Sequence, residues 1–314
     1  MGNYTNLTSK EAKEILTFYS LGELLDISPL SLGISNSNFK LTTSKNGLEN
    51  DYLLKISNDK NQEELIGEQQ ILDYLQKIKF SFSICPLSNL KDNKIFTYKN
   101  YIGAVFPFIK GHPPTPGNKT CQEIGRALAL LHSTKPPEEN ILRKHQQIGF
   151  EAPHIFNFQQ NEKCPKEYKE YFHKIFPKNL RPFMEMTFQE GIIHGDLYYD
   201  NTLFRGDELV TLLDFEQSGI GPLILDIGIS ISGSCLNDNQ IELSLIDSFL
   251  KGYESIRILP DNEKFHLNTS ILLGLFSISL WRIFRFKFGK LDPKRTNSYL
   301  ELLEKANHFY QLVK

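Results

Sequence analysis

The chain has 314 residues, of which 40% are hydrophobic and 23% are charged, as in a soluble globular protein with one large or two modest domains. Its formal net charge of −2 favours neither nucleic acid nor an anionic membrane as a partner. The four cysteines are widely spaced, without Cys-x-x-Cys or histidine at metal-ligand spacing, so neither a zinc site nor a disulfide framework is expected. Reduced thiols and a cytoplasmic location are the resulting expectations.

The apolar segments favour a protein that does not enter a membrane. The first ten residues lack an apolar signal region. The longest uncharged run, residues 267–281, contains Asn, Thr and several Ser, and it is shorter than the ~20 apolar residues of a membrane span. We therefore expect a buried helix there.

The N-terminal segments predict a helix followed by a meander of antiparallel strands. Thr8 or Ser9 followed by Glu11 indicates the start of a short amphipathic helix over residues 10–19. Asn46-Gly47 is the favoured hairpin turn. Strand-like patterns occupy residues 24–32, 38–43, 51–57, 83–87, 95–98 and 101–109.

A loop of small polar residues lies between the first two predicted strands. It contains Ser35, Asn36, Ser37 and Asn38, whose small side chains would let backbone N–H groups approach the phosphates of a nucleotide. The loop has one glycine and is not a Gly-x-Gly-x-x-Gly motif, so an ordinary polar turn is the alternative. The strand lysine that follows it favours the nucleotide-binding interpretation.

A single lysine, Lys55, interrupts an apolar strand. An exposed strand lysine is the alternative, but kinases place a lysine here on the α- and β-phosphates, held by a glutamate of the next helix. Apolar residues at helical spacing predict that helix over residues 62–78. Its candidate partners are Glu63, Glu64 and Glu68.

An apolar strand that runs into a Gly-Pro stretch predicts a domain boundary between residues 1–110 and 111–314. We expect a helix capped by Asn118 next, with His132 as a C-terminal helix residue rather than a ligand. The helices predicted in this part cover residues 120–131, 164–176, 180–190, 242–254, 263–288 and 296–312.

The candidate catalytic residues lie within residues 191–217. A turn-rich loop bears His194, Asp196 and Asn201, and a short apolar strand delivers Asp214. In phosphoryl transfer one Asp orients or deprotonates the attacking hydroxyl, an Asn five residues later holds a metal ion, and an Asp of the next strand holds the bridging metal. Asp196, Asn201 and Asp214 have this order and spacing. Turn formation alone is the alternative reading.

This stretch resembles the aminoglycoside phosphotransferase and choline kinase-like superfamily, in which the loop has the form H-x-D-L-x-x-x-N and the next strand ends in L-D-F. Residues 196–204, DLYYDNTLF, are most similar to its homoserine kinase branch. The resemblance implies an α+β, two-lobed protein kinase-like fold. It would have a small N-terminal antiparallel β-sheet lobe with one main helix and a larger, mostly helical C-terminal lobe.

The resemblance also implies roles for individual residues. ATP and Mg²⁺ would be the cofactors, with residues 1–110 as the nucleotide-binding lobe and 111–314 as the catalytic and substrate-binding lobe. Glu68 is chosen as the partner of Lys55, because it precedes an apolar pair at the spacing of phosphotransferase relatives. Phe108 and Ile109 would form the adenine-binding hinge. Asp226, expected at a helix start after a turn at 219–222, is assigned a structural role that helix capping would explain. In the superfamily an acidic residue at this position packs under the catalytic loop.

The acceptor implied by the resemblance is homoserine, with choline or ethanolamine and then an aminoglycoside as alternatives. Homoserine needs a cation for its carboxylate and an acid for its ammonium group. Arg282 or Arg285 could supply the first, unless they only pair with carboxylates such as Glu301. Asp200 or Glu216 could supply the second.

Choline would instead need aromatic faces around its quaternary nitrogen, for which Tyr198 and Trp281 are available. A pseudokinase that binds nucleotide without turnover is a different class of function. It usually lacks the lysine, the asparagine or one of the aspartates, and all four are present here.

Overall fold

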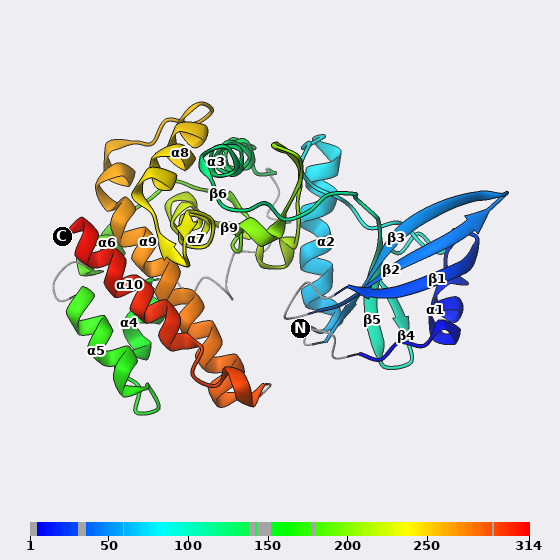
Figure 1. The fold of residues 1–314 in the computed structure, drawn as a ribbon, viewed down its shortest axis with the longest axis horizontal. Coiled ribbons are helices and arrows are strands. Elements are labelled where there is room, and N and C mark those ends of the chain that lie inside the picture. The colour runs from blue at the N-terminus through cyan, green and yellow to red at the C-terminus, as the bar shows by residue number, and fades with distance from the viewer. Residues whose placement is uncertain are drawn as a thin grey trace. The chain divides into compact units, whose positions relative to one another are not determined.

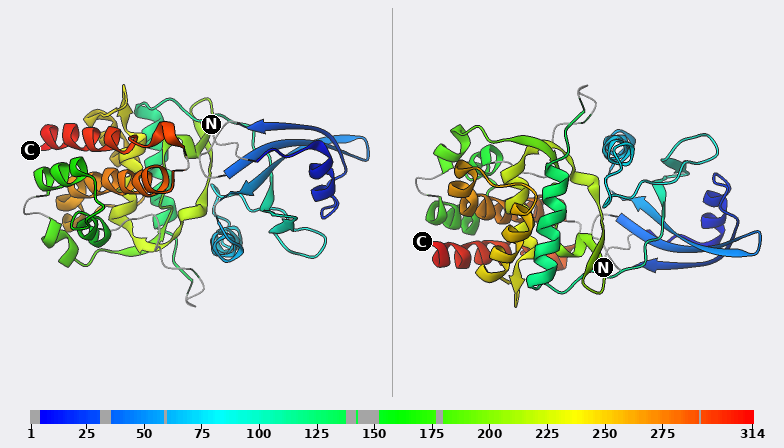
Figure 2. Two further views of the ribbon diagram at one scale, coloured as in Figure 1. Left: turned by 90° about the horizontal axis from the view of Figure 1, so that it is seen from below. Right: turned by 90° about the horizontal axis from the view of Figure 1, so that it is seen from above.

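The computed structural model describes residues 5–30, 36–58, 60–137, 142, 152–176, 180–290 and 292–314. The chain divides into two compact units, Met1–Lys110 and Gly111–Lys314, called here the N-terminal and C-terminal units. Figures 1 and 2 show a β-sheet in the first unit and mainly helices in the second. The α+β composition expected from the sequence is confirmed.

The N-terminal unit is built on a five-stranded antiparallel sheet with the strand order β1-β2-β3-β5-β4. Its strands are β1 (Glu23–Leu30), β2 (Asn36–Lys45), β3 (Leu48–Ser57), β4 (Phe96–Tyr98) and β5 (Tyr101–Pro107). Its helices are α1 (Ser9–Leu16) and α2 (Gln62–Lys77).

Local sequence signals set the ends of these elements. Thr8 and Glu11 form a capping box at α1, which satisfies N–H groups that have no partner within the helix. Asn46 and Gly47 both have positive φ, at 55° and 79°, as a two-residue hairpin turn requires. Both predictions are confirmed.

Two predictions for this unit were wrong. Residues 83–87 form no strand; the Leu87 N–H donates to the Val105 carbonyl at 2.7 Å, but no ladder develops around this single bond. Asn36 and Ser37 lie with Asn38 in β2, paired with residues 55–57 of β3, so the strand begins two residues before the predicted start at Asn38 and takes in part of the predicted turn. Ser35 lies outside the described residues.

The C-terminal unit combines helices with three two-stranded sheets. Its helices are α3 (Asn118–His132), α4 (Ala152–Phe158), α5 (Lys166–Ile175), α6 (Leu180–Glu185), α7 (Leu223–Ser234), α8 (Leu243–Glu254), α9 (Asp261–Arg282) and α10 (Tyr299–Val313). The paired strands are β6 (Glu190–Ile193) with β9 (Gly219–Pro222), β7 (Thr202–Arg205) with β8 (Glu208–Leu212), and β10 (Leu236–Asn237) with β11 (Gln240–Ile241).

Helices α7 and α9 form the centre of this unit. They pack so closely that a Cβ on Gly228 would lie 2.3 Å from the Ser270 carbonyl oxygen. The Ser270 hydroxyl donates to the Ile224 carbonyl at 2.5 Å. Within the described residues, Asp261–Phe288 is the one helix long and apolar enough to cross a membrane, and 72% of its most apolar window is buried in the unit. The expected buried helix is therefore present.

Three local predictions for this unit need correction. The N-cap of α3 is Gly117, and Asn118 is the first helical residue. Residues 219–222 form strand β9 rather than a turn, because they pair with β6. Helix α6 ends at Glu185, and Glu190 begins β6.

Candidate functional site

The loop after β6 holds Asp196 and Asn201 against each other. Asn201, in the 3-10 turn η1 (Tyr199–Asn201), donates its side-chain N–H groups to the Asp196 carbonyl at 2.7 Å and to Asp196 Oδ2 at 3.2 Å. Among the described residues, none donates to Asn201 Oδ1. That oxygen is therefore the atom with which Asn201 could bind a cation.

Backbone and side-chain hydrogen bonds join this loop to the segment that carries Asp214. The Leu213 N–H donates to the Asn201 carbonyl at 2.8 Å. The His194 ring lies 2.9 Å through Nε2 from the Leu213 carbonyl. Asp214 itself has left-handed dihedrals, φ 62° and ψ 57°, which Asp tolerates better than most residues. The three residues selected from the sequence are thus brought together in one unit.

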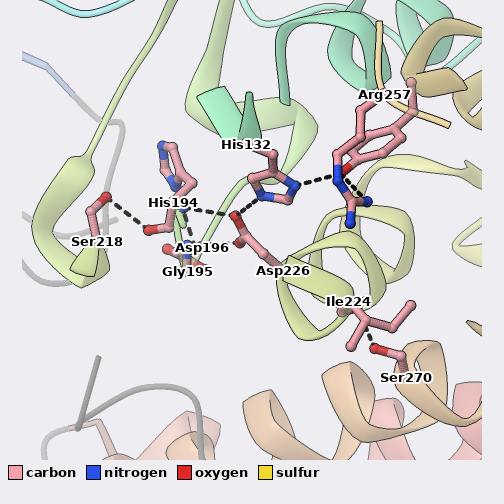
Figure 3. A network of polar contacts seen from close by, with 10 residues as sticks. His132, His194, Gly195, Asp196, Ser218, Ile224, Asp226, Arg257 and Ser270 are labelled. Atoms are coloured by element: carbon pink, nitrogen blue, oxygen red, sulfur yellow. Dashed lines mark hydrogen bonds and ion pairs between the residues drawn. The ribbon is translucent and has the colours of Figure 1, made fainter. Parts of the chain in front are cut away.

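Asp226 accepts hydrogen bonds from the backbone of this loop, as Figure 3 shows. Its Oδ2 accepts from the His194 N–H at 2.7 Å, and its Oδ1 accepts from the Gly195 N–H at 2.8 Å. Oδ2 also lies 2.9 Å from His132 Nε2. The helix N-cap is Pro222, so capping does not explain Asp226. The support of the catalytic loop that the resemblance implies is observed.

A second set of groups, which the sequence did not reveal, extends this network. His132 Nδ1 lies 2.7 Å from the Tyr253 hydroxyl, which accepts from Arg257 at 3.1 Å. Arg257 pairs through both terminal nitrogens with Glu263, each at 2.8 Å. These residues come from three helices and one connection, so sequence spacing carries no sign of their meeting.

We expect Asp226→Asn to destabilise the protein by about 3 kcal/mol, the usual cost of disrupting a fully buried hydrogen-bonded charge. An amide can accept through one atom only, so its NH₂ group would face an N–H donor of the loop. The measurement is thermal or urea unfolding of the variant beside the wild type. Equal stability would contradict the support role.

The same residue predicts an acid dependence. Burial would raise the pKa of Asp226, but the hydrogen bond and charge of His132 and the bond from the His194 backbone lower it below its ordinary value. A carboxyl with a lowered folded-state pKa stabilises the protein above its unfolded-state pKa of about 3.9. That stabilisation is lost as the pH falls through the folded-state value. The stability gap between wild type and Asp226→Asn should therefore narrow below about pH 4.

Carboxylates crowd around Asp196. Desolvation by the surrounding protein, followed by the charges of Asp214, Glu216 and Asp200, raises the pKa of Asp196 well above its ordinary value. A divalent cation relieves such repulsion. Within the described residues no three His, Cys, Asp or Glu side chains already form a metal-binding group. The donor set suits Mg²⁺, which binds one or two protein oxygens and completes its shell with phosphates and water.

The ring of Tyr198 packs against Gly233 of α7, where the glycine leaves room for it. A Cβ at Gly233 would lie 1.7 Å from Tyr198 Cδ1, a distance that no pair of non-bonded carbons tolerates. The aromatic ring therefore lies on the backbone of α7. Tyr198 itself is two residues after Asp196 in the sequence.

We expect Gly233→Ala to displace the Tyr198 ring, to destabilise the protein by about 1–3 kcal/mol as overpacking does, and to lower turnover at least tenfold. Unfolding and steady-state kinetics measure the two effects. In the double variant with Tyr198→Ala the stability penalty of the new methyl should largely disappear, because the ring no longer occupies its place. Additive penalties would contradict the assigned contact.

The other charged residues proposed to bind substrate are two carboxylates and two arginines. Glu216 is buried, and its Oε1 accepts from Gln217 at 3.2 Å, while Asp200 lies at the surface. Arg282 pairs with Glu301 at 3.0 Å, one of the two outcomes expected for it. Arg285 instead stacks over Trp281 at 5.0 Å.

Arg282 and Arg285 have different partners, although a helical period predicts a shared face. The helix widens into a π-helix, η3 (Ile283–Phe288), directly after Arg282. π-Turns occur frequently at functional sites.

In the N-terminal unit Lys55 forms the expected ion pair. Its Nζ lies 3.3 Å from Glu68 Oε1, and both side chains are largely buried. They line a shallow recess, open to solvent, whose other walls include Leu72, Ala104 and Phe106.

Of the other residues predicted to contact the nucleotide, Phe108 and Ser37 have contacts within the N-terminal unit. Phe108 follows β5, with its N–H donating to the Asp51 carbonyl at 3.3 Å and its ring under Lys40. Ile109 is the next residue. Ser37 is fully buried and accepts from the Thr5 N–H at 3.1 Å.

Sequence comparison finds homoserine kinases. The chain is 27% identical over 272 residues to the homoserine kinase of Agrobacterium fabrum (strain C58), covering 84% of this chain and 81% of that protein. It is 27% identical over 330 residues to that of Methylobacillus flagellatus, covering 97% and 95%. The resemblance to the homoserine kinase branch is confirmed.

Structure comparison and a family model agree with this result. Amicoumacin kinase, solved with AMP-PNP, Ca²⁺ and amicoumacin, superposes with a TM-score of 0.71 at 14% identity, covering 98% of this chain and 97% of that one. This likeness confirms the kinase-like fold. The model of the phosphotransferase enzyme family matches residues 26–263. The chain belongs to the phosphotransferase enzyme family.

Proposed function

We propose that this protein is an ATP- and Mg²⁺-dependent kinase that transfers the γ-phosphoryl group of ATP to the side-chain hydroxyl of homoserine. One observation carries the proposal: hydrogen bonds join Asp196, Asn201 and the Asp214 segment into a single arrangement. Relatives that cover most of the chain are homoserine kinases.

Asp196 would accept a hydrogen bond from the hydroxyl group of the acceptor. The oxygen of that hydroxyl forms the new bond to the γ-phosphorus, the bond from this phosphorus to the β-γ bridging oxygen breaks, and ADP leaves. The hydroxyl proton passes to Asp196, whose main contribution is orientation, because the transition state for phosphoryl transfer is loose.

Lys55, held by Glu68, would contact the α- and β-phosphates. Asn201 and Asp214 would hold Mg²⁺, which neutralises charge on the phosphates when it is bound.

The remaining site residues are assigned to parts of the two substrates. The phosphates would lie near Ser35, Asn36, Ser37 and Asn38, and adenine near Phe108 and Ile109. Glu216 and Asp200 are proposed for the ammonium group of homoserine, with Tyr198, Trp281 and Arg285 around the acceptor.

The test is ATP consumption by the purified protein with Mg²⁺ and one acceptor at a time. We expect homoserine to give the largest kcat/KM, above choline, ethanolamine and aminoglycosides. A larger value with choline or an aminoglycoside would replace homoserine as the acceptor. If no acceptor stimulates turnover while nucleotide and Mg²⁺ still raise the melting temperature, the protein is a nucleotide-binding pseudokinase.

A further inference from the structure

Arg282, the last residue of α9, is held along one edge of its guanidinium group. Nη1 donates to the Ser298 carbonyl at 2.8 Å and to Glu301 Oε2 at 3.0 Å. Among the described residues, no partner takes the N–H groups of Nη2 or Nε. The planar group is thus fixed by one nitrogen, and its other edge has the two parallel donors that a carboxylate accepts.

A chain of hydrogen bonds, called the row here, runs from Glu301 through Asn239 to Lys305. Asn239, in the left-handed turn between β10 and β11, donates to Glu301 Oε1 at 2.8 Å. Lys305, buried on α10, donates to Asn239 Oδ1 at 2.9 Å. The row holds Glu301 in the position from which it fixes Arg282.

The charges of this cluster do not cancel. It contains Arg282 and Lys305 as bases and Glu301 as the single carboxylate. Burial opposes ionisation of Glu301, but the hydrogen bond from Asn239 and the charge of Arg282 lower its pKa below the ordinary value. Glu301 therefore remains ionised. Burial lowers the pKa of Lys305, so Arg282 supplies the positive charge that an anionic ligand group requires.

The fold places this cluster near the proposed catalytic residues. Helices α7 and α9 are in contact, since the Ser270 hydroxyl donates to the Ile224 carbonyl and a Cβ on Gly274 would lie 3.0 Å from Ile229 Cα. Near the end of α7 the Tyr198 ring covers Gly233. Burial raises the pKa of Tyr198 well above its ordinary value, the charge of Asp196 raises it further, and the charge of Arg282 lowers it. Both charges therefore lie near the Tyr198 ring.

We propose that Arg282 anchors the carboxylate of the acceptor, with Glu301, Asn239 and Lys305 as positioning residues, so that hydroxy amino acids are preferred over amino alcohols. The proposal rests on the proposed kinase function and adds the group that selects the acceptor. Homoserine and 3-amino-1-propanol form a matched pair of probes, because they differ only by the carboxylate.

The test compares kcat/KM of Arg282→Gln for the two probes. We expect a loss of about 100-fold with homoserine, the size of a lost charge-assisted pair, and less than a threefold change with 3-amino-1-propanol. Arg295→Gln is the control, because Arg295 pairs with Asp292 on the surface. It should leave both values unchanged. Equal losses with the two probes would overturn the proposal.

Lys305→Met tests the positioning residues and serves as a second variant if Arg282→Gln does not fold. We expect a higher KM for homoserine with kcat and the 3-amino-1-propanol values nearly unchanged. An unchanged KM would remove Lys305 from the proposal. A failed kinase function gives a different result: the wild type itself would then phosphorylate neither probe. Wild-type activity on homoserine without loss in either variant would reject only the carboxylate anchor.

Discussion

Asp196→Asn should lower kcat with homoserine by about 10²–10⁴-fold, the range that general acid–base groups contribute. The amide cannot accept the hydroxyl proton, and an NH₂ group in place of Oδ2 would face the Asn201 donor instead of accepting from it. The KM for ATP should change little, since Asp196 is not assigned to the nucleotide. Steady-state kinetics and equilibrium binding of a nucleotide analogue measure the two effects.

Asp207→Asn provides the matched control, because Asp207 lies in the nearby β7–β8 turn and forms an exposed ion pair with Lys119. Such exposed pairs contribute little. The control should retain wild-type turnover. If Asp196→Asn also retained it, Asp196 would not be the residue that handles the hydroxyl.

The sequence predicted those features that depend on neighbours a few residues away. Thr8 with Glu11 specifies the start of α1, and Asn46-Gly47 specifies the hairpin, because each signal acts through its own backbone. A pairing of Lys55 with a glutamate of the next helix was also predictable, since the lysine interrupts an apolar strand and the helix follows it directly. The resemblance to phosphotransferases then selected Glu68 among three glutamates.

Features that depend on distant partners were not predictable in this way. Residues 219–222 look like a turn by composition, yet they become a strand because β6 supplies hydrogen bonds. Asp226 was assigned to helix capping, while its oxygens accept from residues 31 and 32 positions earlier. In both cases tertiary pairing decides the outcome, and one sequence does not show its partner.

The proposed acceptor-binding part shows the same limit at a finer scale. A helical period predicts one face for Arg282 and Arg285, but in the structure Arg282 pairs with Glu301 and Arg285 stacks over Trp281. Lys305 stands among the apolar positions of α10 and is buried there. A lysine in an apolar stripe was the available sign, and its partner Asn239 lies 66 positions away.

Asp214→Asn should reduce Mg²⁺-dependent turnover by about 10³-fold or more, because a carboxylate ligand contributes several kcal/mol to metal-assisted transfer. Asn is the suitable replacement because residue 214 has a left-handed conformation. Alanine there would add a backbone cost of about 1–2 kcal/mol. The variant should also lose the increase in melting temperature that Mg²⁺ adds to a bound nucleotide analogue in the wild type.

Asp92→Asn makes the same chemical change at another left-handed aspartate, with φ 59°, exposed on the N-terminal unit. It should leave turnover and the Mg²⁺-dependent shift intact, which separates loss of a ligand from a backbone effect. A variant at position 214 that kept the shift but lost turnover would move Asp214 from metal binding to another role. Retention of both would remove it from the site, and Asn201 would then need a different partner for the cation.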